Sequence, residues 1–291
     1  MNLMTRSMDT VNNLQNYKNI FKENMLKLYG ANGQTWLDNL PNITQAYAKL
    51  WNLSNLTPLE TLTFNYILSG IYNRKEIILK IGYDSNALFK EQIALKALEN
   101  HGAVKIIAYE GNALLLERLS PGISLQSYLP NRSKEALQIA CDLTKKLHQA
   151  NLPKKINLPS IEERFSLLDK NWPIPNDYLI KARGFRNNLI KSSSPRVVLH
   201  GDLHHDNILK NGKTWKAIDP HGVIGYPINE VWAFAANPEQ DLPFIAQCFN
   251  FNLRDLQECY YAHAVLSSIW AIEDNMDPSF YLALTNKIKL T

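Results

Sequence analysis

The chain of 291 residues is 45% hydrophobic and carries 31 basic against 27 acidic side chains, for a net charge of +4. This length and composition allow a full buried core, in one large domain or in two lobes. The charge excess is small and no run of five or six like charges occurs, which argues against a nucleic-acid-binding surface. Three widely separated cysteines without a CxxC pattern, Cys141, Cys248 and Cys259, favour reduced thiols over a disulfide framework.

The first residues, MNLMTRSMDTVNN, lack the apolar segment that a secretory signal requires. No apolar run in the chain approaches the ~20 residues that a membrane-spanning helix needs. We therefore expect a cytoplasmic protein without a membrane partner.

Helical spacing dominates the first part of the chain, from residue 11 to residue 51. The apolar residues of FKENMLKLY fall on one helix face, and Gly30 and Gly33 then interrupt the pattern. The stretch TWLDNLPNITQAYAKLWNL indicates a further helical pair, with Pro41 at or near a helix start.

Strand-like alternation begins after this helical part. Residues 61–83, TLTFNYILSGIYNRKEIILKIGY, alternate in two runs that YNRKE separates, which predicts antiparallel strands joined by a turn. A helical pattern covers residues 85–102. Two more strand-like runs follow over residues 103–119, with the turn residues EGN between them.

A break at Ser120-Pro121-Gly122 separates this part from a mainly helical remainder. Residues 134–150, KEALQIACDLTKKLHQA, are strongly periodic, and helices are expected again from about Pro227 onwards. The sequence thus predicts a β-rich part over residues 1–119 and an α-rich part over residues 120–291. A crevice between two such lobes is where a ligand site is expected.

One polar loop interrupts the helical part, in the stretch VVLHGDLHHDNIL from Val197 to Leu209. Asp202 and Asn207 have the spacing of the protein-kinase catalytic loop, in which the aspartate accepts a substrate proton and the asparagine binds Mg²⁺. Twelve residues after Asn207, Asp219 follows a short strand and supplies a second, anionic oxygen ligand. Mg²⁺ is a hard cation that prefers such oxygens.

Two other interpretations of this loop compete with the kinase-like one. The loop contains side chains that are able to bind Zn²⁺, namely His200, Asp202, His204, His205 and Asp206. That interpretation leaves Asn207 and Asp219 without a role, and no second dense histidine cluster occurs. Alternatively, the polar groups of the loop satisfy only one another and water.

A phosphoryl-transfer site also needs a cation for the nucleotide phosphates. Lys80 lies in the apolar strand IILKIG, and Glu91 in the next helix is placed to orient it. Each residue also has an ordinary interpretation, as a lysine stem on a sheet edge and as a solvated helix glutamate. The order Lys, Glu, Asp-x4-Asn, Asp along strand, helix, loop and strand end favours phosphoryl transfer.

These motifs resemble the aminoglycoside phosphotransferase family. The loop motif, LLLERLSPG and IDPHGVIGYPINE are similar to the streptomycin 6-kinase and hydroxyurea phosphotransferase branch, and the likeness runs from about Gly33 to near Asp274. It implies an α+β, protein-kinase-like fold of two lobes. The N-lobe would hold a small antiparallel sheet with an N-terminal helical segment, and the C-lobe would be larger and helical.

The resemblance also implies roles for single residues, with ATP and Mg²⁺ as cofactors. Lys80 would contact the ATP phosphates and Glu91 would orient it, and the segment from Glu117 to Leu119 would bind the adenine through its backbone. Asp202 would be the catalytic base. Asn207 and Asp219 would hold Mg²⁺, and the γ-phosphoryl group would pass to a substrate hydroxyl.

Three positions depart from the family pattern. The nucleotide-covering turn near residues 61–66 has no glycine-rich motif, Glu230 replaces the usual aspartate that supports the catalytic loop, and His221 stands where the branch often has lysine. The last two bear on the choice of substrate.

For a cationic acceptor, the stretch SSIWAIEDNMD offers carboxylates beside a tryptophan, in Trp270, Glu273, Asp274 and Asp277. The ordinary interpretation is that acidic residues near a helix end are solvated. Glu239 and Asp241 are weaker candidates, and His204 and His205 receive no assignment.

The favoured hypothesis is a small-molecule kinase whose partner is a hydroxylated compound, either streptomycin-like or hydroxyurea. One alternative is a metabolite kinase of the same fold, acting on a choline-, homoserine- or fructosamine-like compound. Another is a catalytically silent module that binds nucleotide. The sequence does not name the acceptor, the nucleotide preference or the oligomeric state.

Overall fold

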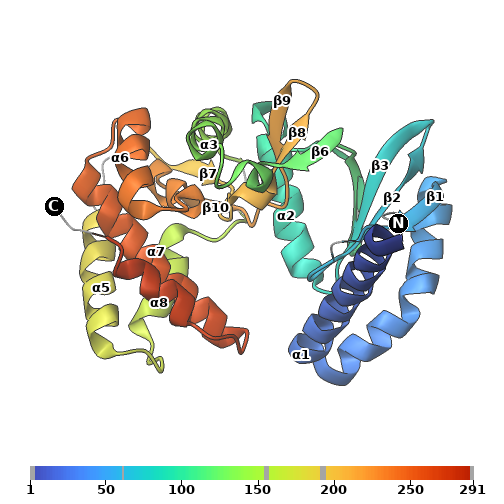
Figure 1. Ribbon diagram of the computed structural model, residues 1–291, viewed down its shortest axis with the longest axis horizontal. Helices are drawn as coiled ribbons and strands as arrows, with labels where there is room; N and C mark the ends of the chain where they lie inside the picture. The colour runs from blue at the N-terminus through green and yellow to red at the C-terminus, as the bar shows by residue number, and fades with distance from the viewer. Residues whose placement is uncertain (1–3, 61, 154–156, 191–194, 289–291) are drawn as a thin grey trace. The chain divides into compact units, whose positions relative to one another are not determined.

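The computed structural model describes residues 4–60, 62–153, 157–190 and 195–288. They form two compact units (Figure 1). Unit 1 comprises the residues up to Gln92 together with Lys105–Arg118, and unit 2 comprises Ile93–Val104 and the residues from Leu119 onwards. The functional division of the chain at residues 119 and 120, into nucleotide and substrate parts, stays a prediction.

Unit 1 is built on one antiparallel sheet. Its five strands are ordered β1-β2-β3-β5-β4, and the two hairpins β2–β3 and β4–β5 are adjacent in this order. The strands are β1 (Ser54–Pro58), β2 (Tyr66–Tyr72), β3 (Lys75–Ile81), β4 (Ile106–Glu110) and β5 (Ala113–Glu117). The antiparallel strands expected in this part of the sequence are confirmed, and β3 is the central strand.

Alternation along β3 determines what each face of the sheet contacts. Ile77, Leu79 and Ile81 point to one face and are fully buried. Apolar side chains of helix α1 (Met4–Trp51), including Trp36 and Tyr47, pack on that face. Because neighbouring side chains of a strand point to opposite faces, Lys80 points away from this apolar cluster.

Helix α1 reverses at Gly30, where φ is 55° (Figure 1). The backbones approach so closely after this kink that a Cβ at Gly33 would overlap the carbonyl of Met25. The expected interruption is therefore present, but the expected helix start at Pro41 is wrong. Pro41 lies inside the helix, where its missing N–H is tolerated because Leu40 and Ile43 beside it pack against the core of unit 1.

Unit 2 is mainly helical, as the sequence predicts. Its helices are α3 (Ser133–Leu147), α4 (Ile161–Phe165), α5 (Asn176–Ile190), α6 (Pro238–Phe249), α7 (Leu253–Glu273) and α8 (Ser279–Thr285). Every residue of α7 from Leu256 to Ile269 is buried, so this helix is the centre of the unit. Among the described residues, none of the helices combines the length and apolar character needed to cross a membrane.

Two small sheets in unit 2 hold the polar loop. Strand β7 (Val197–Leu199) pairs with β10 (Val223–Gly225), and β8 (Ile208–Asn211) pairs with β9 (Thr214–Ala217). Residues 200–207 connect β7 to β8, and residues 218–222 connect β9 to β10. Because both connections join the same two sheets, they are brought together. Strand β8 also pairs with β6 (Pro121–Ser124).

Candidate active site

In unit 1, Lys80 and Glu91 form a buried ion pair. Lys80 Nζ lies 2.7 Å from Glu91 Oε2, and the two residues are only 3% and 6% exposed. Lys80 belongs to the central strand β3, and Glu91 belongs to helix α2 (Ser85–Leu98). The interpretations as an edge lysine and a solvated glutamate are therefore wrong. The attraction within a buried charge pair often does not repay the cost of removing both charges from water, so this pair is the first candidate for a functional element.

The segment predicted to contact adenine begins at the end of β5. Two hydrogen bonds join Glu117 to Lys105. The Glu117 N–H donates to the Lys105 carbonyl at 3.0 Å, and the Lys105 N–H donates to Glu117 Oε1 at 2.8 Å. Leu119 is buried. The adenine contact of this segment stays a prediction.

In unit 2, the loop of residues 200–207 is held by hydrogen bonds to its own backbone and to the neighbouring connection. His200 Nε2 lies 2.8 Å from the carbonyl oxygen of Ile218, and the Ile218 N–H donates to the carbonyl of Asn207 at 2.9 Å. Asp219, which follows Ile218, is thereby fixed beside the loop. Its φ of 61° is in the left-handed region, which is uncommon for a non-glycine residue and frequent at functional sites.

Glu230 supports the loop through hydrogen bonds to the first two residues of its backbone. It is 1% exposed, and its two carboxylate oxygens accept the N–H groups of His200 and Gly201, the latter at 2.9 Å. Burial alone would raise the pKa of Glu230, but the neighbouring imidazoles of His148, at 3.8 Å, and His200, together with the hydrogen bond from the Gly201 N–H, outweigh it and lower this pKa below its ordinary value. The longer side chain, where the family usually has aspartate, thus still performs the supporting task.

Replacing Glu230 with alanine should lower the free energy of unfolding by about 2–5 kcal/mol, because two buried N–H groups lose their acceptor. Urea denaturation measures this loss. Glu230→Gln keeps one acceptor oxygen and should lose less. Because folding lowers the pKa of Glu230, its contribution is present at neutral pH and is lost as the pH falls through the folded-state value. Equal stability of wild type and Glu230→Ala at pH 7 would refute this role.

Asp202 has an imidazole on each of two sides. Its Oδ2 lies 3.5 Å from His204 Nε2 and 3.8 Å from His221 Nε2. Burial favours the protonated carboxyl, but the hydrogen bond from His204 and the charges of His221 and His204 outweigh it, so the pKa of Asp202 is lowered. Asp202 is therefore ionised at neutral pH and is able to accept a hydrogen bond from a substrate hydroxyl.

Asn207 and Asp219 offer the donor types that Mg²⁺ prefers. The Asn207 amide nitrogen donates to the carbonyl of Asp202 at 2.8 Å, which fixes the amide so that its oxygen is the group presented as a ligand. An amide oxygen and a carboxylate oxygen fit Mg²⁺, which completes its shell with water and phosphate oxygens.

The structure supports the zinc interpretation less well than the magnesium interpretation. Within the described parts of the chain, no three His, Cys, Asp or Glu side chains are grouped as metal ligands. His200 is engaged with Ile218, as described above. His205 is buried and its neighbour His204 lines a pocket instead, so the two adjacent histidines point to different surroundings.

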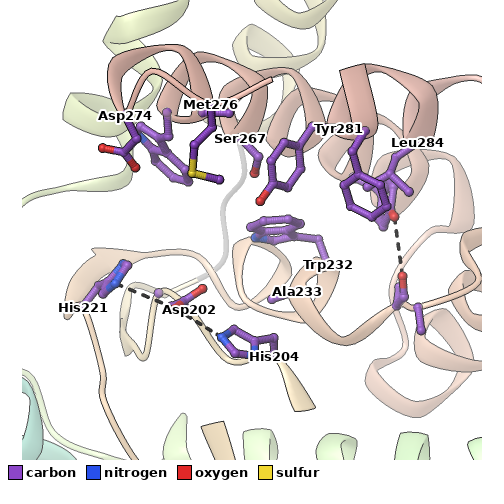
Figure 2. A pocket seen from close by; sticks show the side chains of 17 residues that line it. Asp202, His204, His221, Trp232, Ala233, Ser267, Asp274, Met276, Tyr281 and Leu284 are labelled. Atoms are coloured by element: carbon purple, nitrogen blue, oxygen red, sulfur yellow. Dashed lines mark hydrogen bonds and ion pairs between the residues drawn. The ribbon is translucent and has the colours of Figure 1, made fainter. Parts of the chain in front are cut away.

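A pocket of about 440 Å³ opens beside Asp202 within unit 2 (Figure 2). Asp202 and His204 from the loop and His221 from the connection between β9 and β10 line one side of it, and residues from α7 and α8 line another. Trp270 and Asp274, both predicted as substrate residues, are among the lining. Glu273 is exposed and does not line the pocket, so the structure does not bring it together with Asp202.

The remaining acidic candidates lie elsewhere. Asp241 Oδ2 accepts the Asn237 N–H at 2.7 Å at the start of α6, and Asp277 Oδ1 accepts the Ser279 N–H at 2.9 Å before α8. Both carboxylates thus satisfy backbone groups at helix starts. Glu239 is exposed in the first turn of α6 and is not part of the pocket lining.

Two important residues escaped sequence reasoning. Arg164 Nη1 donates to the carbonyl of Gly201 at 3.0 Å, and its guanidinium lies 5.6 Å from the ring centroid of Trp270. Burial lowers the pKa of Arg164 to about 10, against the opposing charges of Asp202 and Glu230. Trp232 lines the pocket, and the one signal in the sequence that could have indicated it is its place two residues after Glu230.

Several solved structures share this fold. The aminoglycoside phosphotransferase APH(4)-Ia matches with a TM-score of 0.66 and 12% identity, over 84% of this chain and 97% of that one. The choline kinase LicA from Streptococcus pneumoniae matches with a TM-score of 0.63 and 14% identity, over 85% and 96%. A choline/ethanolamine kinase family protein from Mesorhizobium loti gives 0.62 and 16%, over 81% and 87%. The α+β, protein-kinase-like fold is confirmed.

The sequence identifies the family within this fold. Residues 75–275 match the profile of the aminoglycoside/hydroxyurea antibiotic resistance kinases, and the chain belongs to that family. It is 31% identical to streptomycin 3''-kinase from Klebsiella pneumoniae over 147 residues, which are 50% of this chain and 55% of the relative. The match thus spans about half the length of that relative.

Proposed function

We propose that the protein is an ATP- and Mg²⁺-dependent phosphotransferase that moves the γ-phosphoryl group of ATP to a hydroxyl of a small molecule. The observation that carries this proposal is the position of Asp202, an ionised carboxylate at the wall of a pocket large enough for a small molecule. The solved relatives include ternary complexes of APH(4)-Ia with AMP-PNP or ADP and hygromycin B, which supports a nucleotide and an acceptor here.

Each residue of the candidate site has a task in such a transfer. Asp202 accepts the hydrogen bond of the acceptor hydroxyl, orients it and takes its proton as the new P–O bond forms and the bond from the γ-phosphorus to the bridging oxygen breaks, which releases ADP. Lys80, oriented by Glu91, binds phosphate oxygens of the nucleotide. Asn207 and Asp219 would hold Mg²⁺, which neutralises phosphate charge when bound. Positioning and charge neutralisation supply most of the rate in phosphoryl transfer.

The acceptor we propose is an aminoglycoside resembling streptomycin. Asp274 and the aromatic lining of the pocket suit a cationic, hydroxylated compound, and the curated relative is a streptomycin kinase. Hydroxyurea is the second acceptor that the family supports. A choline-, homoserine- or fructosamine-like acceptor shares the same chemistry, since the fold does not select the acceptor.

A silent nucleotide-binding module is the second candidate function. The connection between β1 and β2, residues 59–65, contains no glycine, so the backbone cradle that many kinases place over the phosphates is missing from the sequence. Residue 61 lies outside the described residues. This candidate predicts nucleotide binding without turnover.

A screen of ATP consumption separates the two candidates. The purified protein is assayed with Mg²⁺ and ATP against streptomycin, other aminoglycosides, hydroxyurea, choline, homoserine and a fructosamine. We expect consumption above the Asp202→Asn blank with at least one aminoglycoside, and loss of that signal when EDTA removes Mg²⁺. Thermal stabilisation by ATP without consumption for any compound would favour the silent module instead.

A further inference from the structure

The indole of Trp232 has a buried side and a side in the pocket. Trp232 belongs to the short helix η6 (Val231–Phe234), is half-buried, and lines the pocket. The imidazole of His263, from α7, stacks against it with a centroid distance of 4.8 Å and an interplanar angle of 9°. Phe165 contacts the same imidazole at 4.9 Å. The rings packed on its buried side therefore fix the orientation of the indole.

The supporting imidazole is uncharged. His263 is 3% exposed, its Nε2 lies 3.2 Å from Asn229 Oδ1, and its Nδ1 has no hydrogen-bond partner in the described part of the chain. Burial, and to a smaller extent the positive charge of Arg164, lower the pKa of His263 to about 3. A ring that is neutral at physiological pH thus lies behind Trp232.

Trp270, the other tryptophan of the pocket, has a charged neighbour instead. The guanidinium of Arg164 lies 5.6 Å from its ring centroid, and the pKa of Arg164, about 10, keeps this group protonated. A cation over an aromatic face uses the negative potential of the π system. The π system of Trp270 is therefore already engaged by the protein, whereas the ring stacked on Trp232 is the neutral imidazole of His263.

Trp232 is also fixed in relation to the catalytic loop. Glu230, two residues before it, accepts the N–H groups of His200 and Gly201, so one short segment positions both the loop and the indole. Figure 2 shows the Trp232 indole between the Asp202 side of the pocket and Tyr281. An aromatic face together with the carboxylate of Asp274 in the same lining is a suitable environment for a cation.

From this arrangement we infer that Trp232 stacks on a planar cationic group of the acceptor, such as a guanidinium, and so determines specificity, with His263 as its positioning residue. The inference rests on the proposed function for the transfer step but not for the binding step. It sets a selection rule: acceptors that carry a planar cation bind in preference to neutral, urea-like ones of the same shape. Hydroxyurea would then be a poor acceptor.

The binding step is tested with two probes of equal shape and different charge, propylguanidinium and propylurea. Their dissociation constants for the full chain are measured by ligand-detected NMR titration. We expect the wild type to bind propylguanidinium about five- to tenfold more tightly than propylurea. Trp232→Leu should lose this preference and Trp232→Phe should keep part of it, whereas Trp215→Leu, at a tryptophan of β9 outside the pocket lining, should leave it unchanged.

The positioning role of His263 has its own readout. His263→Ala removes the support and should raise the acceptor KM about three- to tenfold, with the KM for ATP unchanged. His263→Phe restores a stacking ring and should restore most of the acceptor affinity. A merely structural role would move both KM values, or would show no rescue.

The outcomes for binding and for transfer are separable, because propylguanidinium carries no hydroxyl to phosphorylate. Absence of turnover with every acceptor would end the proposed function but leave the binding result standing. A wild type without preference for propylguanidinium over propylurea would overturn the inference, whatever the turnover. So would a Trp232→Leu variant that keeps the full preference. Circular dichroism checks that the variants fold. If Trp232→Leu does not fold, the comparison of the wild type with Trp232→Phe decides the inference.

Discussion

Replacing Asp202 with asparagine is expected to lower kcat by about 10²–10⁴-fold, the range typical for loss of a positioned acid or base. The amide keeps the size of the side chain but cannot take the proton of the acceptor hydroxyl. The loop should keep its shape, because the hydrogen bond from Asn207 at 2.8 Å goes to the backbone carbonyl of residue 202, which the change leaves in place.

Two controls accompany this measurement. The thermal stabilisation by ATP and Mg²⁺ should be close to that of the wild type, because the change leaves untouched the nucleotide contacts proposed for Lys80. The acceptor KM should change much less than kcat, since the base acts mainly in the transition state. A kcat for Asp202→Asn within threefold of the wild-type value would mean that another group performs this step.

Replacing Lys80 with methionine is expected to have the second largest effect, on both stability and nucleotide use. The change removes one partner of the buried ion pair, the ammonium that lies 2.7 Å from Glu91 Oε2, which costs about 3–5 kcal/mol of unfolding free energy. It also removes the cation proposed to bind phosphate, so the KM for ATP should rise and kcat should fall. Urea denaturation gives the first effect, and steady-state kinetics give the second.

The double variant Lys80→Met/Glu91→Leu separates these two contributions. Its stability should return to within about 1–2 kcal/mol of the wild type, because both charges of the buried pair are removed together. Its activity should stay as low as that of Lys80→Met alone. Recovery of activity in the double variant would show that the pair is structural and does not bind the nucleotide.

The sequence predicted those parts of the fold that depend on local patterns. The alternation around Lys80 located a strand, and the spacing of Asp202 and Asn207 located the loop, because both features are set by neighbouring residues. It was wrong about Pro41, where packing of Leu40 and Ile43 outweighs a local preference. Neither the central position of β3 nor the burial of Lys80 followed from the strand pattern alone.

Long-range contacts in the site were beyond such reasoning. Arg164 contacts Gly201 across 37 positions, and His263 reaches Trp232 from another helix, so no local spacing connects them. The likeness to the family indicated a supporting carboxylate at Glu230 but not the tryptophan that follows it. The carboxylates near the end of α7 were indistinguishable in the sequence, and only the helix geometry separates Asp274, in the pocket, from Glu273, outside it.

The most direct measurement is the chemical identity of the product. The wild-type protein is incubated with ATP, Mg²⁺ and the best acceptor of the screen, and the mixture is analysed by mass spectrometry and phosphorus NMR. The proposed function predicts an acceptor that has gained one phosphoryl group as a monoester on a hydroxyl, formed in step with ADP and absent with Asp202→Asn. Release of inorganic phosphate with an unchanged acceptor would contradict it.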